Sequence, residues 1–597
     1  MKKKNLESTI SKRIKVIHLF FTIFAVVAIV FVFRWTVVQG AKFDLLAKNR
    51  FQNQTLTSMR GSIFAKDGTT LAYTEPRVSI SVWLKNLYDY EQWHTQTVDE
   101  LVTKVAPIIS LTKEEIYKKF DDAKASVNGS DKVTVILATD LNLEQWNQIK
   151  SLDRDNAPTY PLLGIQSKVT PKRIYPEGRL ASHLLGLTNT YKEELIGEAG
   201  IERRFSDVLK PVDGLISQET DARGLTITST LLQTIEPKNG SDVYITINKK
   251  LQAVVEEQLK IGVEKYDAKS GTIIIQDPKT GEVMALANYP DYDPNTRSET
   301  DINAYGNLAI TSPYETGSIG KILTIATAID KELITPDTII MPEGHQGCEK
   351  IHNDLNPVCT WDRKPQPPMP ARDCFQKSDN LCFYHMATLI NRKDFYDHLI
   401  DFGVGSESGI DLKEESIGYL KSYDSWTVGD VSAFSYGHGY LVNAVQAINE
   451  TSTIANYGVR MQPLIVDKIV SAEGEITEYN PIVKSRAVTK ETAETVVDMM
   501  RYNFSKSIPE WYYGYMKNYD IGVKSGTALI ANSTGYSNNI NATFVGFDAS
   551  EERSFVMLIR LEDPKIPSYD RLAFYNVRPM WLDTFGAIRD IIGVPTK

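Results

Sequence analysis

Cysteine is scarce in this chain and is confined to one stretch. None of the four cysteines precedes residue 348, which excludes a lipid anchor on an N-terminal cysteine. Two disulfides are favoured because the N-terminus predicts export, and three pairings are possible. Free thiols are one alternative, and a zinc site with His345 and His352 is another, although no CxxC pair supports it. The possible disulfide residues are Cys348, Cys359, Cys374 and Cys382.

An excess of positive charge is also missing. The chain has 66 Lys and Arg against 75 Asp and Glu, a net charge of −9. Binding to phosphate backbones needs a basic face, so the composition argues against nucleic acid as a partner. The sequence shows no internal repeat and no low-complexity tract, which excludes a solenoid or a disordered linker protein. A multidomain globular protein remains.

A single long apolar run follows a basic N-terminus. Residues 16–33 are almost entirely apolar, and Arg34 follows them. At about 1.5 Å per residue this run reaches roughly 27 Å, enough to span a bilayer if Arg34 snorkels outward. Lysines and Arg13 in the first fifteen positions predict a cytoplasmic N-terminus, with the remaining chain outside on a single-pass anchor in the cytoplasmic membrane. The alternative is a cleaved signal peptide, with Val38 and Gly40 as the small residues before the cut, but the run is longer than a typical signal core.

Shifts in pattern along the chain predict four segments. The polar stretch 236–241, with Pro237 and Gly240, is the best linker. After it, strand patterns are grouped with helices, including an apolar helix at 318–333, which predicts an α+β domain. The expected segments are a cytoplasmic tail at 1–15, a transmembrane helix at 16–38, a first extracytoplasmic domain at 39–235 with an inserted lobe at about 87–160, and a second domain at 242–597.

Three short motifs of catalytic type occur in order in the second domain. Ser318 and Lys321 begin the apolar helix, Ser378 and Asn380 follow, and residues 524–527 lie on a predicted strand. Each motif alone is weak, because similar triplets occur elsewhere. Order, spacing and the buried helix after Ser318 distinguish the three motifs at 318–321, 378–380 and 524–527 from these similar triplets. The similar triplets are Ser110 with Lys113, residues 269–272 and residues 537–539.

The chemistry of acyl transfer explains these residue types. Residues three apart on a helix share a face, so Lys321 is expected beside the hydroxyl of Ser318. Burial and the like charge of Lys524 favour a neutral Lys321, which can take the proton of Ser318, the nucleophile. Ser378 would pass a proton to the leaving amine, and Asn380 would orient Lys321 and the substrate. The simpler readings are a helix N-cap for Ser318 and a turn residue for Ser378.

The third motif is expected to bind the end of the substrate. Lys524, Ser525 and Thr527 would hold a terminal carboxylate, and Gly526 would let substrate backbone lie close to the strand. The backbone N–H groups of Ser318 and Thr527 would form the oxyanion site.

With these motifs the chain resembles the class B, monofunctional penicillin-binding proteins over nearly its whole length. The resemblance implies a penicillin-binding/serine β-lactamase-like transpeptidase domain on an elongated mixed α/β pedestal (a dimerisation-like domain), with one N-terminal transmembrane helix. It also implies a D,D-transpeptidase that cross-links D-Ala-D-Ala stem peptides through a Ser318 acyl-enzyme, binds β-lactams and uses no cofactor or metal. Further segments that carry the resemblance are 60–63, 67–68, 200–202, 281–287, 290–295, 314–317, 435–439 and 454–458.

Some positions depart from the family pattern, and some roles stay open. Thr316 stands where proline is usual, and the cysteine window beside Ser378 is uncommon. No glycosyltransferase domain lies between anchor and pedestal, so we expect a separate glycosyltransferase and divisome proteins as partners. The stretch 290–295 favours the division-specific, septal branch. The alternatives are an elongation-type enzyme, a β-lactam-hydrolysing or sensing protein of the same fold, and a non-catalytic scaffold.

Overall fold

The chain forms two compact units in the computed structural model. The first contains Met1–Ser58, Pro76–Thr170 and Val212–Lys238, and the second Met59–Glu75, Pro171–Pro211 and Asn239–Lys597. The predicted linker 236–241 lies where the chain enters the second unit for the last time, and the predicted domain limits stay predictions. The structure describes residues 2–39, 51–91, 97–152, 165–191, 194–220, 226–296, 301–341, 343–353, 356–360, 362–508, 514–532, 535–565 and 572–597.

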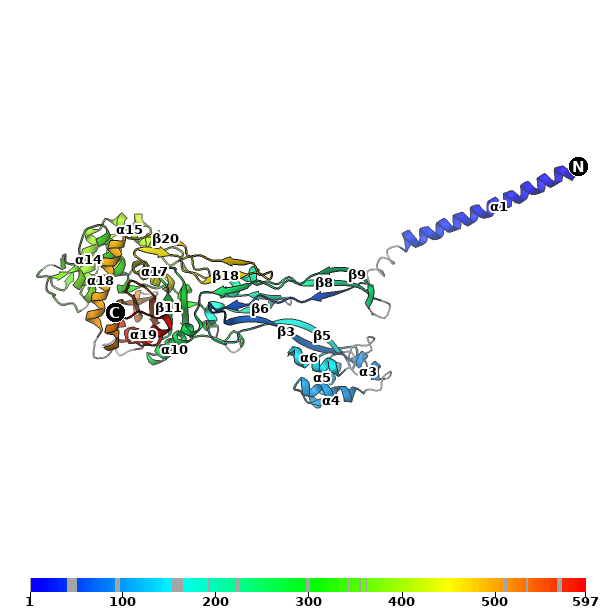
Figure 1. Cartoon of the computed structure of the whole chain (residues 1–597), viewed down its shortest axis with the longest axis horizontal. Coiled ribbons are helices and arrows are strands. Elements are labelled where there is room, and N and C mark those ends of the chain that lie inside the picture. The colour runs from blue at the N-terminus through cyan, green and yellow to red at the C-terminus, as the bar shows by residue number, and fades with distance from the viewer. Residues whose placement is uncertain are drawn as a thin grey trace. The chain divides into compact units, whose positions relative to one another are not determined.

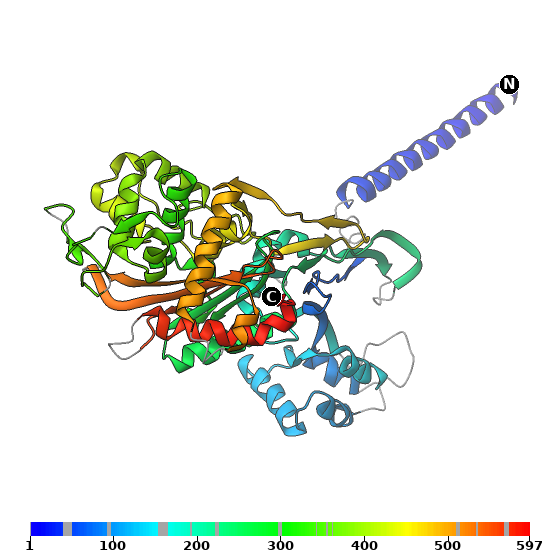
Figure 2. The same cartoon turned by 60° about the vertical axis from the view of Figure 1, so that its left-hand side comes forward.

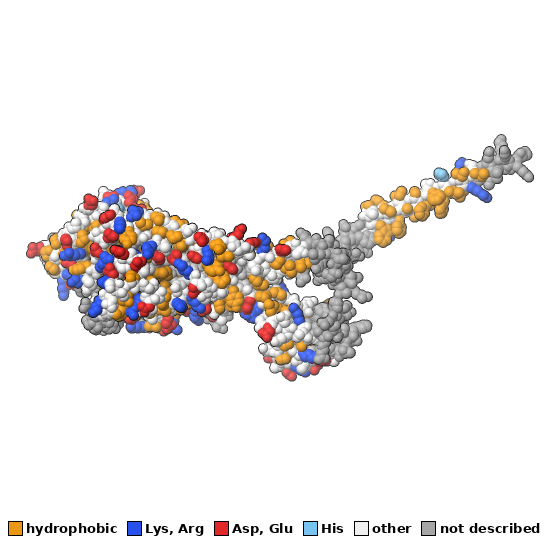
Figure 3. Space-filling model, viewed as in Figure 1, with side chains coloured by type: hydrophobic (Ala, Val, Ile, Leu, Met, Phe, Trp, Pro, Cys, Tyr) orange, Lys and Arg blue, Asp and Glu red, His pale blue; other side chains and the backbone are white. Residues whose placement is uncertain are grey.

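The first unit begins with a long exposed helix. Helix α1 (Lys2–Phe33) continues into the π-helical segment η1 (Arg34–Val38). Its apolar side chains face outward along the helix, as the orange atoms in Figure 3 show. Within the described residues, one helical span is long enough and apolar enough to cross a membrane. It is Ile10–Val37, which has 28 residues, and its apolar window is not buried. Because exposed apolar surface of this size is unfavourable in water, the helix is consistent with a single-pass membrane anchor.

The rest of the first unit is a small antiparallel sheet and a helical lobe. The sheet has the order β1-β8-β9, and the lobe has its own core, with Phe120 and Ile149 buried. Helix α5 begins where it does because Thr112 and Glu115 form a reciprocal capping box. The predicted lobe residues 92–96 and 153–160 lie outside the described part of the chain. The elements are β1 (Phe51–Leu56), β3 (Thr70–Trp83) from Pro76 onward, α3 (Leu84–Glu91), α4 (Val98–Ile108), α5 (Lys113–Ser126), β4 (Thr134–Leu141), α6 (Leu143–Ser151), β5 (Ile165–Ile174) as far as Thr170, β8 (Gly214–Thr220) and β9 (Thr226–Ile235).

A five-stranded antiparallel sheet organises the second unit. Its order is β12-β11-β23-β22-β21, so β12 is an edge strand and β11 pairs with β23 from the end of the chain. Every residue of β11 is buried, because helices cover both faces of the sheet. Ile273 and Ile275 point into one core, and Ile274 between them points into the other. The strands are β11 (Ser270–Gln276), β12 (Val283–Tyr289), β21 (Ile521–Asn532), β22 (Gly535–Asp548) and β23 (Val556–Glu562).

Helices α10 and α19 pack on one face of this sheet, as Figure 2 shows, and α17 and α18 pack on the other. Together with the sheet they confirm the predicted α+β class. Nearly all residues of α12 are buried, as its apolar sequence predicts. The helices are α10 (Lys249–Lys265), η4 (Ile302–Tyr305), α11 (Leu308–Thr311), η5 (Gly317–Ile319), α12 (Lys321–Asp330), α13 (Ala371–Lys377), α14 (Asn380–Leu389), α15 (Arg392–Asp401), η6 (Tyr423–Ser425), α16 (Val428–Ser435), α17 (Ala444–Ala455), α18 (Lys490–Ser507), η7 (Gly514–Asn518), η8 (Ala573–Tyr575) and α19 (Val577–Ile592).

A buried ion triad joins segments of the second unit that are far apart in sequence. Glu202 accepts from Arg60 at 2.8 Å and from Arg173 at 2.6 Å, and all three side chains are almost fully buried. Segments 60–63 and 200–202, which both carry the family resemblance, therefore meet here. The smaller elements are β2 (Ile63–Phe64), α7 (Ser182–Leu185), β6 (Thr188–Tyr191), β7 (Glu194–Gly197), α8 (Gly200–Arg204), α9 (Ser206–Leu209), β10 (Asp242–Ile245), β13 (Ile339–Met341), β14 (Cys348–Glu349), β15 (Val358–Cys359), β16 (Met369–Pro370), β17 (Val459–Met461), β18 (Val466–Val470), β19 (Ile476–Glu478) and β20 (Val483–Arg486); Figure 1 labels the larger ones.

Removal of Glu202 should destabilise the second unit strongly. In Glu202→Ala two guanidinium groups stay buried without a counter-charge, and breaking such an ion pair costs about 3–5 kcal/mol. Thermal melting of the purified protein measures the effect. Glu494→Ala is the matched control, because its pair with Lys490 is exposed and 3.9 Å long. Equal melting temperatures for the two variants would contradict the prediction.

Candidate active site

Ser318 lies in a tight turn at the start of the buried helix. The sequence predicts one helix over 318–333, whereas the structure has the 3₁₀ turn η5, which contains Ser318, followed by α12. The backbone of Gly317 has a positive φ of 55°, which interrupts a regular helix start. Lys321 still follows Ser318 on the same side, and its Nζ lies 3.0 Å from Oγ of Ser318. The predicted proximity of hydroxyl and amine is therefore present.

The partners of Lys321 determine where its lone pair points. Its Nζ donates to the carbonyl oxygen of Ser378 at 2.6 Å and to Oδ1 of Asn380 at 2.7 Å. Both oxygens are acceptors only, so they use the two hydrogens of a neutral amine. The remaining lone pair is left for the hydroxyl of Ser318. Such an amine can accept the proton of the serine.

Burial favours the uncharged form of this amine. Lys321 has no exposed surface, and burial, with Lys524 as the second cause, holds its pKa well below the ordinary lysine value. The rings of Phe383 and Phe375 lie 5.4 Å from Nζ of Lys321 and 5.6 Å from Nζ of Lys524, respectively. Motif reasoning missed both rings. Their only signal in the sequence is position: Phe375 lies three residues before Ser378, and Phe383 lies three residues after Asn380.

Ser378 connects the two lysines. Its Oγ accepts from Nζ of Lys524 at 2.9 Å and lies 3.3 Å from Nζ of Lys321. Lys524 also donates to the carbonyl of Ser525 at 2.9 Å, and burial lowers its pKa to about 7. The four polar groups from Ser318 to Lys524 thus form one chain of contacts, along which a proton can move between nucleophile and leaving group.

Strand β21 approaches the serine turn closely enough to require glycine. A Cβ on Gly526 would lie 2.4 Å from the carbonyl oxygen of Thr316, and one on Gly317 would lie 2.5 Å from that of Thr527. Ser525 and Thr527 are half-buried and share a face of the strand. The hydroxyl of Thr527 accepts the N–H of Ala573 at 3.0 Å, which leaves its own hydrogen free to donate. This edge offers hydroxyl donors beside a lysine, as a carboxylate requires.

The loop between α13 and α14 holds Ser378 and Asn380 in place. Ser378 has a left-handed backbone with φ 56°, and Asp379 caps α14 by accepting the N–H of Cys382 at 3.0 Å. A disulfide between Cys374 and Cys382 links the two helices on either side of the loop. Sequence reasoning missed Asp379 as a capping residue, although an Asp before a helix is a usual cap.

The remaining cysteines and the rival triplets lie away from these contacts. Cys348 and Cys359 form the second disulfide across strands β14 and β15. Ser110 lies in the first unit, between α4 and α5. Lys269 pairs with Glu562, and the hydroxyl of Ser537 donates to the carbonyl of Ile530. None of these triplets joins the contacts around Ser318.

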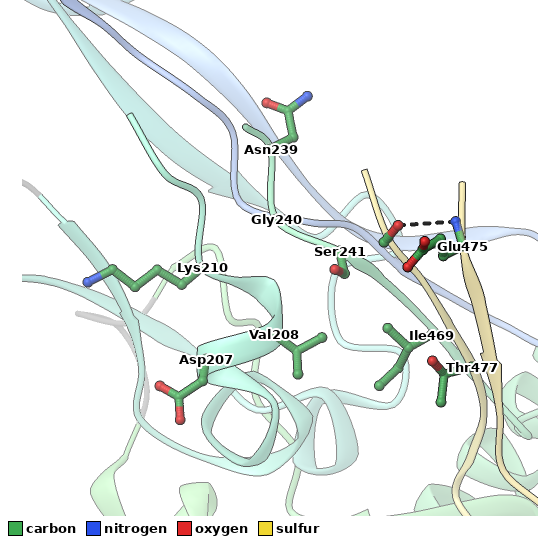
Figure 4. A pocket seen from close by; sticks show the side chains of 10 residues that line it. Asp207, Val208, Lys210, Asn239, Gly240, Ser241, Ile469, Glu475 and Thr477 are labelled. Atoms are coloured by element: carbon green, nitrogen blue, oxygen red, sulfur yellow. Dashed lines mark hydrogen bonds between the residues drawn. The ribbon is translucent and has the colours of Figure 1, made fainter. Parts of the chain in front are cut away.

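A separate cavity of about 420 Å³ also occurs in the second unit. As Figure 4 shows, residues from three segments line it, and the N–H of Glu475 donates to the hydroxyl of Ser471 at 3.1 Å. It contains no residue of the three motifs, so it is not the predicted site. Its lining residues are Asp207, Val208, Lys210, Asn239, Gly240, Ser241, Ile469, Ser471, Glu475 and Thr477.

Two family models match the chain. Residues 271–575 match the penicillin binding protein transpeptidase domain, and residues 55–245 match the penicillin-binding protein dimerisation domain. The three motifs fall within the first match, and both partners of the Glu202 ion triad fall within the second. The predicted fold, with a dimerisation pedestal before the transpeptidase domain, is thus confirmed.

Individual relatives cover most of the chain. Stage V sporulation protein D of Bacillus subtilis is 25% identical over 537 residues, which covers 88% of this chain and 78% of the relative. Peptidoglycan D,D-transpeptidase FtsI of Escherichia coli is 26% identical over 522 residues, covering 86% and 81%. The crystal structure of penicillin binding protein 2X from Streptococcus thermophilus has a TM-score of 0.74 at 21% identity, covers 91% of this chain and 81% of that one, and shows the same fold.

The depressed pKa of Lys524 predicts a specific pH dependence of stability. Its folded pKa of about 7 lies below the ordinary 10.5, so between these values the unfolded chain binds the extra proton. Stability from this group therefore rises with pH, and its burial is most costly at or below about pH 7. In Lys524→Met this cost is gone, and the like charge that lowers the pKa of Lys321 is removed as well.

Melting temperatures of the native protein and Lys524→Met, measured from neutral to alkaline pH, check this. The difference, variant minus native, should be most positive at neutral pH and should shrink as the pH rises. Lys517→Met, on an exposed lysine of the same unit, is the control and should show no such trend. A difference that does not vary with pH would contradict the prediction.

Proposed function

The chain belongs to the penicillin-binding protein transpeptidases and is a peptidoglycan D,D-transpeptidase, and we propose that Ser318 forms its acyl-enzyme during septal wall synthesis. Penicillins bind this class of enzyme in place of the peptide. The proposal includes the other two motifs as the proton relay and the carboxylate site. It also includes a cytoplasmic N-terminus, supported by the basic residues before the apolar helix, and a separate glycosyltransferase as partner.

One observation carries the assignment of Ser318. The amine of Lys321 is buried, donates to Ser378 and Asn380, and lies 3.0 Å from the serine hydroxyl, so that the neutral amine has its lone pair available to that hydroxyl. A serine becomes a nucleophile when a neighbouring base takes its proton. Ser110, the other serine of S-x-x-K type, has no such amine, because Lys113 is partly exposed and pairs with Asp99 at 3.1 Å.

The proposed reaction proceeds in two steps. Lys321 takes the proton as Oγ of Ser318 attacks the carbonyl carbon of the donor's terminal peptide bond. The oxyanion is held by the N–H groups of Ser318 and Thr527, and the proton passes through Ser378 to the departing D-alanine amine. Lys524, Ser525 and Thr527 hold the carboxylate of that residue. The amine of a second stem peptide then displaces Ser318.

Substitution of Ser318 and Lys321 tests this assignment. Ser318→Ala should abolish the covalent penicillin adduct, and Lys321→Ala should slow its formation by about 10²–10⁴-fold, since a general base is lost. Intact-mass analysis after exposure to penicillin measures both. The matched controls are Ser110→Ala and Lys113→Ala in the rival triplet, which should label normally.

The same experiment separates related activities. A stable adduct is expected of a transpeptidase, whereas rapid loss of the adduct with release of hydrolysed penicillin would indicate a hydrolase. Full labelling of Ser318→Ala would refute the proposed nucleophile. Normal acylation of Lys321→Ala would refute the proposed base.

The septal part of the proposal rests on the resemblance of residues 290–295. In the structure Asn295 bonds to both the N–H and the carbonyl of Tyr175, at 3.0 and 2.9 Å. If the role is septal, depletion of the protein in its own cells should produce filaments that elongate without dividing, and a fluorescent fusion should gather at division sites. Rounded cells with a dispersed fusion would instead support the elongation role.

A further inference from the structure

Glu315 lies three residues before Ser318 and has no role in the contacts described so far. Its Oε1 accepts the N–H of Gly439 at 2.8 Å, and its two oxygens accept the hydroxyl of Tyr536 at 2.9 and 3.1 Å. The side chain is half-buried. Among the residues that the structure describes, no lysine or arginine pairs with it. Within the described part of the chain, this carboxylate thus has neutral donors and no lysine or arginine partner.

The loop that binds Glu315 is pressed against the serine turn. Gly437 accepts the N–H of Gly317 at 3.0 Å, and a Cβ on Gly437 would lie 1.8 Å from the carbonyl oxygen of Gly317. The next residue, His438, has its ring 5.4 Å from that of Tyr436 and 6.4 Å from that of Tyr536. Two tyrosine rings therefore flank His438, and one of them, Tyr536, also donates its hydroxyl to Glu315.

The two substrates of a transpeptidase carry opposite charges, and so do the two groups of residues around Ser318. The donor ends in a carboxylate, for which Lys524, Ser525 and Thr527 are suited. The acceptor presents a primary ammonium, which needs an anion near the acyl carbonyl. Glu315 is attached through the chain to the turn that carries the acyl group, and it is accessible.

We propose that Glu315 and Tyr536 bind the ammonium of the acceptor stem peptide, and that His438 takes the proton which this ammonium must lose. The inference rests on the proposed function, because it needs an acyl group on Ser318. Nδ1 of His438 lies 3.4 Å from the carbonyl oxygen of Tyr436, which can only accept, so Nδ1 carries the hydrogen. Nε2 is then the acceptor, and burial lowers the pKa of His438, which favours this neutral form.

The step balances in atoms and protons. The ammonium gives one proton to His438, and the free amine attacks the ester carbonyl carbon on Ser318, forming the C–N bond. The amine nitrogen gives a second proton to Lys321, which passes it to Oγ of Ser318 as the C–O bond breaks. The products are the cross-linking amide, free Ser318 and one proton on His438, which is released to water.

Two acceptors of different charge test the proposal. The full-length protein in detergent receives a thioester analogue of the D-Ala-D-Ala donor, and amide formation is followed at rising acceptor concentration. The first acceptor is Nα-acetyl-lysine amide, whose side chain is an ammonium at neutral pH. The second is hydroxylamine, which is uncharged there and needs neither an anion nor the first proton transfer.

The variants separate binding from proton transfer. Glu315→Gln keeps an acceptor for Gly439 and Tyr536 but loses the charge, so KM for the lysine acceptor should rise about tenfold. His438→Gln cannot take a proton and should lower kcat with the lysine acceptor by about a hundredfold. Hydroxylamine should show neither effect. Glu551→Gln, on an exposed turn, is the control.

The failures are distinguishable. If Glu315→Gln slows penicillin acylation by as large a factor as it raises KM for the lysine acceptor, Glu315 only positions the serine turn and the proposal is wrong. It is also wrong if both acceptors are affected equally, or if neither is. Loss of the Ser318 assignment would appear separately, as penicillin labelling that persists in Ser318→Ala.

Discussion

In the proposed mechanism, the chemistry of this enzyme depends on a lysine amine held without charge in a buried site. A protonated Lys321 would have no lone pair, and the hydroxyl of Ser318 would remain a poor nucleophile. Burial and the like charge of Lys524 act together against protonation, and Asp379 acts in the opposite direction. Burying two lysines costs folding free energy at neutral pH, so the two cores on either side of the central sheet must offset it.

The backbone around the site is arranged to keep that amine and its partners together. Gly317, Gly437 and Gly526 lie where the serine turn, the 437–439 loop and strand β21 meet at distances that admit no Cβ. The disulfide between Cys374 and Cys382 links the helices on either side of the second motif. Interiors pack as densely as organic crystals, so a misplaced strand would move every catalytic distance. These features explain why a reactive group can be held on what are formally turns and loops.

Local pattern predicted the catalytic groups, and long-range packing determined the rest. The spacing of Ser318 and Lys321 predicted their proximity, because three residues along any helical turn lie on one side. The spacing could not choose among three cysteine pairings, since the choice depends on how α13 meets α14. It also could not find Phe375 and Phe383, which act by excluding water and carry no motif. The predicted helix start was wrong at Ser318, because Gly317 is held in a left-handed conformation by contacts from residues more than a hundred positions away.

The state of Lys524 connects substrate binding to the activity of Lys321. Burial lowers the pKa of Lys524 to about 7, so its two forms are close in free energy near neutral pH. A donor carboxylate beside it favours the charged form, as an opposite charge does for any ionisable group. That charge in turn disfavours a proton on Lys321, to which Lys524 is connected through Oγ of Ser378. In the proposed mechanism the base is therefore most completely neutral when a peptide carboxylate is bound, and a ligand without a carboxylate does not produce this effect.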